Sequence, residues 1–361
     1  AFLTITGRND WSSTLPANNR SYFYPSVSGS FVFSEALKIK NHILDYGKIR
    51  AGYAKVGRDA SPYSLADVFE VGTNFLSQST ASIAGTSNDP QLKPEFSKEL
   101  ELGTYLSFLK NRITLDLAWY DKRSTNLIAP ISTPASSGFS QYYTNFGGIS
   151  NKGVEVELTG VPVKTNAFSW SITGAFTKNK NIVTELTNGV TRLPLAGVLT
   201  SIAPYAEVGM PFGYLRGERS ARDSNGNLLI DPSTGMLIRD SEQGMIGNPN
   251  PDYKLGITNA FKYKNFTLGV LFDMTKGGDI YSVTISSMLG RGVTTDTEDR
   301  LKTWVIPGVY GNPNTKLPIL DGSGNTIPNV TRITTNDYIL EKPSQPMRLR
   351  SGMFMTPQYI G

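Results

Sequence analysis

The chain lacks cysteine altogether and has a single histidine, His42, among its 361 residues. The absence of cysteine excludes a disulfide-stabilised scaffold and thiolate metal sites. Catalysis also finds little support, because there is no thiol nucleophile and only one imidazole base. His42 is therefore interpreted as a surface or capping residue.

Long apolar runs are also missing. No segment approaches the ~18 consecutive apolar residues that a transmembrane helix needs, so a membrane role would require a β-barrel. A net charge of +5 with dispersed Lys and Arg gives no basis for a nucleic-acid partner. The mean hydropathy of −0.22 is compatible with a barrel, since half of each barrel strand faces a polar lumen.

What the sequence does contain is long alternation of apolar and polar residues. Between Lys98 and Thr159, two arms flank Lys110-Asn111-Arg112, and each has one apolar and one polar face. The arms alternate for about ten residues or more, the length that a tilted strand needs to cross a bilayer. The pattern predicts antiparallel, membrane-spanning strands.

The same pattern recurs along the chain and predicts about ten strands in all. Outside the two arms, the expected strands are Ala1–Arg8, Tyr22–Phe33, Lys48–Val56, Lys152–Val161, Phe168–Thr177, Tyr253–Tyr263, Phe266–Thr275 and Met347–Met355. The segment Ser34–Tyr46 is instead a candidate short helix, capped by Ser34, carrying Leu37 and Leu44 and ending at Gly47.

Short and long connections alternate between these strands. The short ones are Ser34–Gly47, Lys110–Arg112, Pro162–Ala167 and Lys264-Asn265; the long ones are Asn9–Ser21, Asp59–Pro94, Ser124–Ser150, Lys178–Asp252 and Lys276–Gln345. In an up-and-down sheet all short turns then lie at one end, as in outer-membrane barrels. The alternative is a soluble β-sandwich or β-repeat protein, whose loops rarely sort by length.

Motifs spread over the whole chain are similar to those of one family. They are Gly7-Arg8-Asn9-Asp10, Tyr24-Pro25-Ser26-Val27-Ser28, Lys48-Ile49-Arg50-Ala51, Leu92-Lys93-Pro94-Glu95, Glu99-Leu100-Glu101-Leu102-Gly103, Asn145-Phe146-Gly147-Gly148, Asn151-Lys152-Gly153-Val154-Glu155, Ile246-Gly247-Asn248-Pro249-Asn250-Pro251-Asp252-Tyr253, Tyr263-Lys264-Asn265-Phe266, Gly277-Gly278-Asp279-Ile280-Tyr281 and Arg300-Leu301-Lys302-Thr303-Trp304. Together they resemble the SusC/RagA family of TonB-dependent outer-membrane transporters.

The resemblance implies an all-β fold, an antiparallel up-and-down transmembrane β-barrel with long extracellular loops, located in the bacterial outer membrane. Plugged transporters of this kind close with 22 strands. Residues 1–361 are therefore expected to form the C-terminal part of a barrel, without the plug and N-terminal domains and without the final strands. A closed ten-stranded barrel is the alternative.

The resemblance also implies a function and partners. A TonB complex, contacted through the missing N-terminal part, would power uptake past a plug, and a SusD-like surface lipoprotein would act as a lid. The expected ligand is an oligosaccharide or a peptide, and outer-membrane lipid would surround the barrel. No cofactor is expected. The alternative function is a surface-exposed outer-membrane barrel that acts as an enzyme or adhesin.

Candidate ligand contacts are aromatic residues in the long loops, because aromatic faces suit polar ligands such as sugars. They are Phe139, Tyr142, Tyr143, Tyr205, Tyr214, Trp304 and Tyr310. The alternative is that these side chains pack their own loops or lie in the interfacial belt. The connection Lys178–Asp252 is too long to be structureless inside a compact unit, so we expect it to be ordered.

One string resembles a calcium loop. Asp223, Asn225, Asn227 and Asp231 place oxygen ligands at alternate positions, as a Ca²⁺ site requires. Leu228 stands where the EF-hand pattern has glycine, and an Asn-Gly turn explains the string without a metal. Carboxylate pairs such as Glu155 and Glu157 are interpreted as solvated lumen charges rather than catalytic acids.

Overall fold

The computed structural model describes residues 1–39, 43–187, 189–195, 202–337, 347–348 and 352–358. His42 lies outside the described residues, as do positions 349–351 within the last strand that the sequence predicts.

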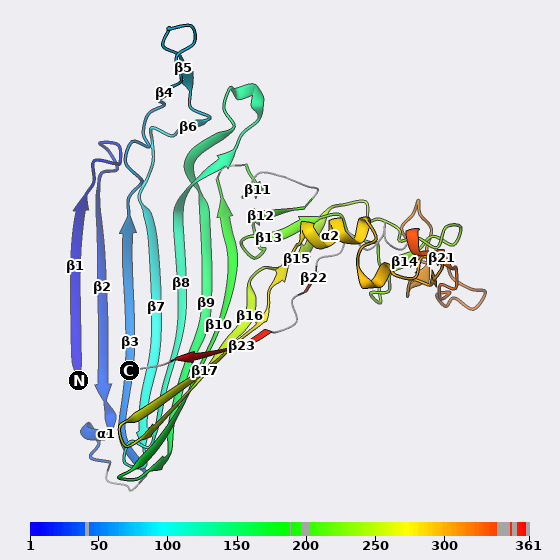
Figure 1. Cartoon of the computed structure of the whole chain (residues 1–361). Coiled ribbons are helices and arrows are strands. Elements are labelled where there is room, and N and C mark those ends of the chain that lie inside the picture. Colours follow the sequence, from blue (N-terminus) through cyan, green and yellow to red (C-terminus); the bar gives the residue numbers. More distant parts are fainter. Residues whose placement is uncertain (40–42, 188, 196–201, 338–346, 349–351, 359–361) are drawn as a thin grey trace.

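An 11-stranded sheet dominates the molecule and forms a tall curved wall (Figure 1). Ten of its strands are neighbours in chain order and all pair antiparallel: β1 (Phe2–Trp11), β2 (Ser21–Val32), β3 (Leu44–Arg58), β7 (Glu95–Phe108), β8 (Ile113–Ser132), β9 (Gln141–Lys164), β10 (Phe168–Leu186), β16 (Pro251–Tyr263), β17 (Phe266–Gly277) and β23 (Gly352–Gln358). β1 and β23 end this order and do not pair with each other within the described part of the chain. The expectation of an open, partial barrel is confirmed.

Short elements make up the rest. The short strands are β4 (Phe69–Val71), β5 (Ala81–Ile83), β6 (Thr86–Asn88), β11 (Arg192–Pro194), β12 (Ala203–Glu207), β13 (Tyr214–Gly217), β14 (Leu229–Ile230), β15 (Gly244–Gly247), β18 (Asp279–Ile280), β19 (Thr303–Trp304), β20 (Val309–Tyr310), β21 (Ile333–Thr334) and β22 (Met347–Arg348). The helices are α1 (Phe33–Ala36) and α2 (Val283–Gly290), with 3₁₀ turns η1 (Ala135–Ser137) and η2 (Thr295–Thr297). None of the helices that the structure describes is long and apolar enough to cross a membrane.

Strand register sorts the side chains of the wall onto two faces, because residues directly opposite each other in a sheet share a face. Leu102, Trp119 and Val154 are successive partners across β7, β8 and β9. Three residues further along each strand, Tyr105, Asp116 and Glu157 are successive partners on the other face. We call these the apolar face and the polar face.

The register confirms the side-chain orientation that the alternation predicts. The following residues share the apolar face: Leu100, Leu102, Leu106, Phe108, Ile113, Leu115, Leu117, Val154, Val156, Leu158, Trp170, Ile172, Leu255, Ile257, Leu268 and Val270. The following share the polar face: Glu101, Thr114, Asp116, Glu155, Glu157, Ser171 and Thr173.

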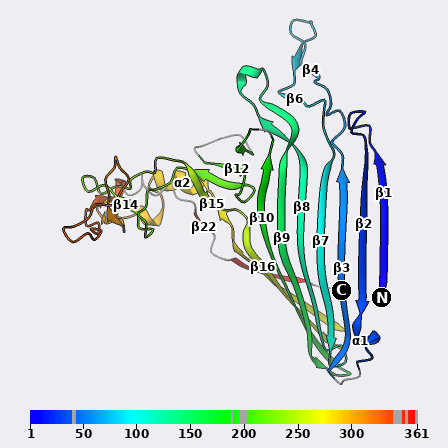
Figure 2. The ribbon, with the colours of Figure 1, turned by 180° about the vertical axis from the view of Figure 1, so that it is seen from behind.

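The short turns lie side by side at one end of the wall (Figures 1 and 2). Backbone hydrogen bonds link them in sequence: Leu109 N–H donates to Ile43 O, Val161 N–H to Arg112 O, and Lys264 N–H to Ala167 O. The long connections leave from the opposite end, and this topology is as predicted. Aromatic rings gather on the apolar face beside the short turns, where Trp170 stacks on Phe261 with ring centroids 5.8 Å apart.

The prediction of a helix from Ser34 to Tyr46 is wrong. α1 is a single turn, and Leu44 already belongs to β3. Ser34 is buried and does not cap the helix; its hydroxyl accepts a hydrogen bond from Gly47 N–H at 3.0 Å. The ring of Phe33 occupies the space where a Cβ of Gly47 would lie, so packing between these segments starts the strand early.

The predicted loop Ser124–Ser150 is mostly strand. β8 and β9 contain 20 and 24 residues, and they continue past the length needed to cross a bilayer as a tall hairpin. The register shifts between Ser124 and Leu127, where Asn126 takes a φ of +55°. This bulge absorbs the irregular stretch of sequence, so cross-strand pairing resumes beyond it.

The two longest connections, after β10 and after β17, fold together. β14 from the first pairs in parallel with β20 from the second, Leu229 opposite Val309 and Ile230 opposite Tyr310. We call the unit formed by residues 218–240 and 303–335 the two-loop module. Its shared core buries Ala221, Leu229, Ile230, Ile238, Ile306, Val309 and Ile333. The expectation that the first connection is ordered is confirmed for its described residues.

A pair of neighbouring substitutions on β9 tests the two faces of the wall. If lipid covers the apolar face, Val156→Arg will lower the unfolding free energy of the full-length protein in lipid vesicles by about 2–4 kcal/mol, because a cation near the bilayer centre is costly. Glu155→Arg is the matched control, since its side chain lies on the polar face. Equal losses for both variants in a urea titration would contradict this assignment of the faces.

Candidate functional site

The polar face carries a charge network at its centre. Arg50 on β3 reaches Glu101 on β7, with Nε 3.2 Å from Oε1, and Asp116 on β8, with Nη1 2.8 Å from Oδ1. These side chains come from three adjacent strands and remain partly exposed to solvent. The network therefore links strands while leaving carboxylate oxygens open to water.

Small residues on the polar face make room for large neighbours. A Cβ at Gly103 would lie 2.6 Å from Cζ of Arg50, so the guanidinium lies across the bare backbone of β7. The ring of Tyr120 covers Gly153 in the same way. Glycines in a strand interior often mark such close approaches. The side chains of Arg50 and Tyr120 therefore lie close to the backbone of the neighbouring strand instead of projecting from the wall.

A recess of about 440 Å³ opens beside the Arg50 network on this face. Glu155 and Glu157 line it together with Asp116, and Arg50 and Lys254 contribute cationic groups. The recess offers both acceptors and cationic donors to a polar molecule. Among the residues that the structure describes, no three His, Cys, Asp or Glu side chains are grouped as they would be around a metal ion.

A hydrophobic cluster holds the connections at the long-loop end. Leu15 and Leu92 are fully buried there with Tyr22 and Ala60, and Phe96 packs against them. Leu15 belongs to the connection after β1 and Leu92 to the connection before β7, so the cluster ties two separate loops to the top of the wall.

The two-loop module contains repeated turns built on one acidic residue. Oδ1 of Asp223 accepts hydrogen bonds from Asn225 N–H at 2.9 Å and Asn227 N–H at 2.8 Å. Oδ1 of Asp321 does the same for Ser323 N–H and Asn325 N–H, at 2.8 and 2.9 Å. These are turns in which an Asp side chain replaces a backbone acceptor.

The oxygens of the calcium-like string are engaged inside the module. The second carboxylate oxygen of Asp223 accepts from Asn227 Nδ2 at 2.9 Å, and Oδ1 of Asp231 accepts from the backbone and hydroxyl of Ser233. Hydrogen bonds therefore account for this arrangement of Asp223, Asn225, Asn227 and Asp231. Calcium binding stays a prediction.

Two of the candidate ligand contacts lie together next to the wall. Tyr205 on β12 and Tyr214 on β13 face each other with ring centroids 6.3 Å apart. Tyr214 is fully buried, and its hydroxyl donates to Glu207. The pKa of Tyr214 is raised, chiefly because the ring is buried and in addition because its hydroxyl donates to Glu207. A fully buried ring has no surface to offer a ligand, whereas Tyr205 is only half-buried.

The other candidates are spread over two places. Trp304 packs against the core of the two-loop module and donates from Nε1 to Thr335 Oγ1 at 3.2 Å, and Tyr310 bonds Thr331 through its hydroxyl at 2.9 Å. The rest lie at the β8–β9 hairpin: Phe139 in the connection, Tyr142 and Tyr143 within β9 itself. The seven aromatics do not converge on one site, and ligand contact by any of them stays a prediction.

The shared module and the Arg50 network were not foreseen. The sequence does carry a signal for the first, because Asp223-Ser-Asn225-Gly-Asn227 and Asp321-Gly-Ser323-Gly-Asn325 repeat one turn pattern in two loops. Register alone would have placed Arg50, Glu101 and Asp116 on one face.

The acidic turns predict a pH dependence. Hydrogen bonds from Asn227 lower the pKa of Asp223 below its ordinary value of 3.8, and backbone hydrogen bonds from Asn325 and Ser323 lower that of Asp321. A carboxylate whose pKa falls on folding stabilises the folded form above its ordinary pKa. That contribution is lost as the pH drops below 3.8 and through the lowered value.

Hydrogen exchange of the full-length protein between about pH 2 and 5 measures this effect. The protection factors of the Asn225 and Ser323 amides, each two residues after its aspartate, will fall toward the acid end. The turn at Asn312 is an internal control, because its side chain accepts from Asn314 N–H at 2.8 Å, as Asp223 accepts from Asn225 N–H at 2.9 Å, but does not titrate. A parallel acid loss of protection at Asn314 would contradict a carboxylate origin.

Comparison with known proteins places this wall in a family. Residues 2–270 match the family model described as TonB dependent receptor-like, beta-barrel. The TonB-dependent receptor P3 of Formosa agariphila is 30% identical over 342 residues, which cover 87% of this chain and 34% of that receptor. The TonB-dependent receptor SusC of Bacteroides thetaiotaomicron is 24% identical, covering 73% of this chain and 28% of SusC.

The structure of the RagAB peptide transporter shares the fold, with a TM-score of 0.67 and 20% identity over 80% of this chain and 33% of that chain. The chain thus spans about a third of the length of the relatives that it matches. Its open wall, with one apolar and one polar face, matches a part of those longer proteins. The chain belongs to the TonB-dependent receptor-like β-barrel family of the bacterial outer membrane.

Proposed function

We propose that this chain is the barrel segment of a SusC/RagA-type importer that takes up an oligosaccharide or a peptide. The observation that carries the proposal is a single sheet with an apolar outer face, a charged inner face and long, ordered connections at one end. The outer face meets lipid, the inner face borders a water-filled lumen, and the long connections reach outside the cell.

The inner wall suits the passage of polar solutes. The recess beside Arg50 provides carboxylates and cationic groups, and hydroxyl pairs such as Thr159 and Thr173 lie on the same face. Such a wall exchanges hydrogen bonds with a sugar or a peptide as readily as with water. One neighbour of this fold is named a peptide transporter, which supports this class of ligand.

TonB powers the uptake in this proposal, as the names of the relatives suggest. Those relatives are about three times as long as the segment that they share with this chain, so we assign the plug and the TonB contact to sequence outside the shared third. All these relatives are named receptors, which favours a transporter over a surface enzyme or adhesin.

The two-loop module is the part that we assign to the SusD-like lipoprotein lid. It projects to one side of the wall from beyond the upper ends of β16 and β17 in both views (Figures 1 and 2). Its buried core gives the module a fixed shape, so a lid can bind to an ordered surface. Flexible loops would instead lose conformational entropy each time the lid closed. Its surface also keeps apolar side chains exposed, including Leu320 and Val330.

Two substitutions in the full-length protein separate the module from the barrel. Leu229→Asp puts a carboxylate into the fully buried centre of the module and will unfold it, because a buried charge without a partner is strongly destabilising. Uptake and co-purification of the lipoprotein should both fall to background. Leu317→Asp is the matched control, since that leucine is 63% exposed, and the module should stay folded.

Barrel assembly is followed in both variants by resistance to SDS without heating. The strands of the wall do not include Leu229, so both variants should assemble. Wild-type uptake and lipoprotein binding in an assembled Leu229→Asp protein, with the module shown unfolded by proteolysis, would rule out this role for the module.

A further inference from the structure

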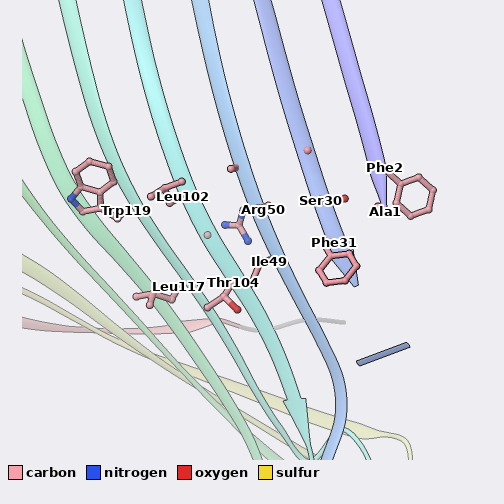
Figure 3. A pocket seen from close by; sticks show the side chains of 13 residues that line it. Ala1, Phe2, Ser30, Phe31, Ile49, Arg50, Leu102, Thr104, Leu117 and Trp119 are labelled. Carbon is pink, nitrogen blue, oxygen red and sulfur yellow. The ribbon is translucent and has the colours of Figure 1, made fainter. Parts of the chain in front are cut away.

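The apolar face is interrupted by a groove. Gly29 on β2 and Ala51 on β3 are direct partners, so two adjacent strands present almost no side chain at the same height. The groove has a volume of about 680 Å³ and opens on the lipid-facing side of the wall (Figure 3). Glycine in a strand interior weakens the strand unless something approaches closely there.

Large apolar side chains wall the groove. Phe31 and Ile49, which are also direct partners, lie one row below Gly29 and Ala51. Leu102 and Trp119 continue the row of Ala51 across β7 and β8. Ile49, Leu102 and Trp119 remain 40–49% exposed, so the sides of these side chains that line the groove are available to an occupant (Figure 3).

Polar groups next to the groove are engaged elsewhere. The hydroxyl of Thr104, which lines the groove, donates to Lys48 O at 3.1 Å. Ser30 and Arg50, which also line the groove, are direct partners on the opposite face, where Arg50 pairs with Glu101 and Asp116. The groove therefore offers an occupant apolar contact without directional hydrogen bonds, which selects for hydrocarbon.

We propose that this groove binds the acyl chain of an outer-membrane lipid. The face that it opens on is turned toward membrane hydrocarbon, and its lining is complementary to a chain of methylene groups. An empty groove would lose dispersion contacts along its walls. An unbranched acyl chain in the groove is contacted from several sides, whereas a chain on a flat stretch of the wall is contacted from one side only. The bound lipid completes the packing between β2, β3 and β7.

A second barrel is a poorer match for this site. Protein interfaces usually surround an apolar centre with a polar rim that supplies hydrogen bonds. Here the residues at the edges of the groove on the same face, Leu3, Phe31 and Leu117, are apolar. The surroundings are those of a lipid site embedded in a lipid-facing wall.

The test fills the groove and leaves the rest of the face unchanged. Gly29→Leu places a side chain in the groove, and the nearest atom to its new Cβ, Phe2 O, is 3.8 Å away, so the backbone is not crowded. Gly174→Leu is the matched control. Gly174 is an apolar-face glycine on β10 outside the groove, and its new Cβ would lie 4.0 Å from Leu158 O.

Bound phospholipid is counted by native mass spectrometry on the full-length protein extracted in mild detergent. Gly29→Leu should retain one phospholipid fewer than wild type, and Gly174→Leu should retain the same number as wild type. Equal counts in all three proteins would overturn the proposal. Should Gly29→Leu fail to assemble, Ala51→Leu fills the same groove from the neighbouring strand and is judged by the same outcomes.

Trp119 supplies a second readout, because it lines the groove. Phospholipid with brominated acyl chains, added at equimolar amounts in detergent, should quench the tryptophan fluorescence of Trp119. The contribution of Trp119 is identified as the part of the emission that is missing in Trp119→Phe. Gly29→Leu should lose most of this quenching, whereas Gly174→Leu should keep it. If filling the groove instead abolishes self-association in sedimentation and leaves lipid binding and quenching unchanged, the occupant is a second copy and the proposal fails.

Discussion

Pairing of every long strand with its neighbour in the chain is the constraint on which the rest of this structure depends. Backbone N–H and C=O groups in a bilayer must be satisfied within the protein, and the antiparallel ladder from β1 to β23 does this strand by strand. Because the ladder fixes register, it also fixes which side chains meet lipid and which meet water. Leu102 and Trp119 on one face, and Asp116 and Glu157 on the other, follow from the same hydrogen bonds.

Strands and faces could be predicted from the sequence because both depend on a period of two. Where the alternation is unbroken, the polar or apolar character of a residue such as Glu155 or Val156 predicts the face of the sheet on which it lies. Local composition is misleading where strand pairing overrides it. The Ser- and Gly-containing stretch after Ser124 has the composition of a loop, yet β8 and β9 continue through it once a bulge has restored the register. Ser34 has the chemistry of a helix cap, but its hydroxyl serves Gly47 across the turn.

The candidate sites were harder to predict for a related reason. Trp304 and Tyr310 are aromatic residues in connections, which is also the description of a ligand contact, but their partners are far away in sequence. Trp304 packs beside Ile230 and Ile333, and that proximity follows from the pairing of β14 with β20. Long-range pairing of such short strands leaves no periodic trace. The lipid-side groove escaped notice because Gly29 and Ala51 each look ordinary in their own strands and matter only as partners.

The parallel pairing of Leu229 with Val309 also constrains how the β16–β17 hairpin can leave the bilayer. The β16–β17 hairpin lies between these two residues in the chain, so the module encloses a hairpin that spans the membrane. Closing this core joins the two outer ends of the hairpin to each other, so the finished module holds both strands together from outside the bilayer. Withdrawing either strand from the bilayer then requires opening a hydrophobic core outside it.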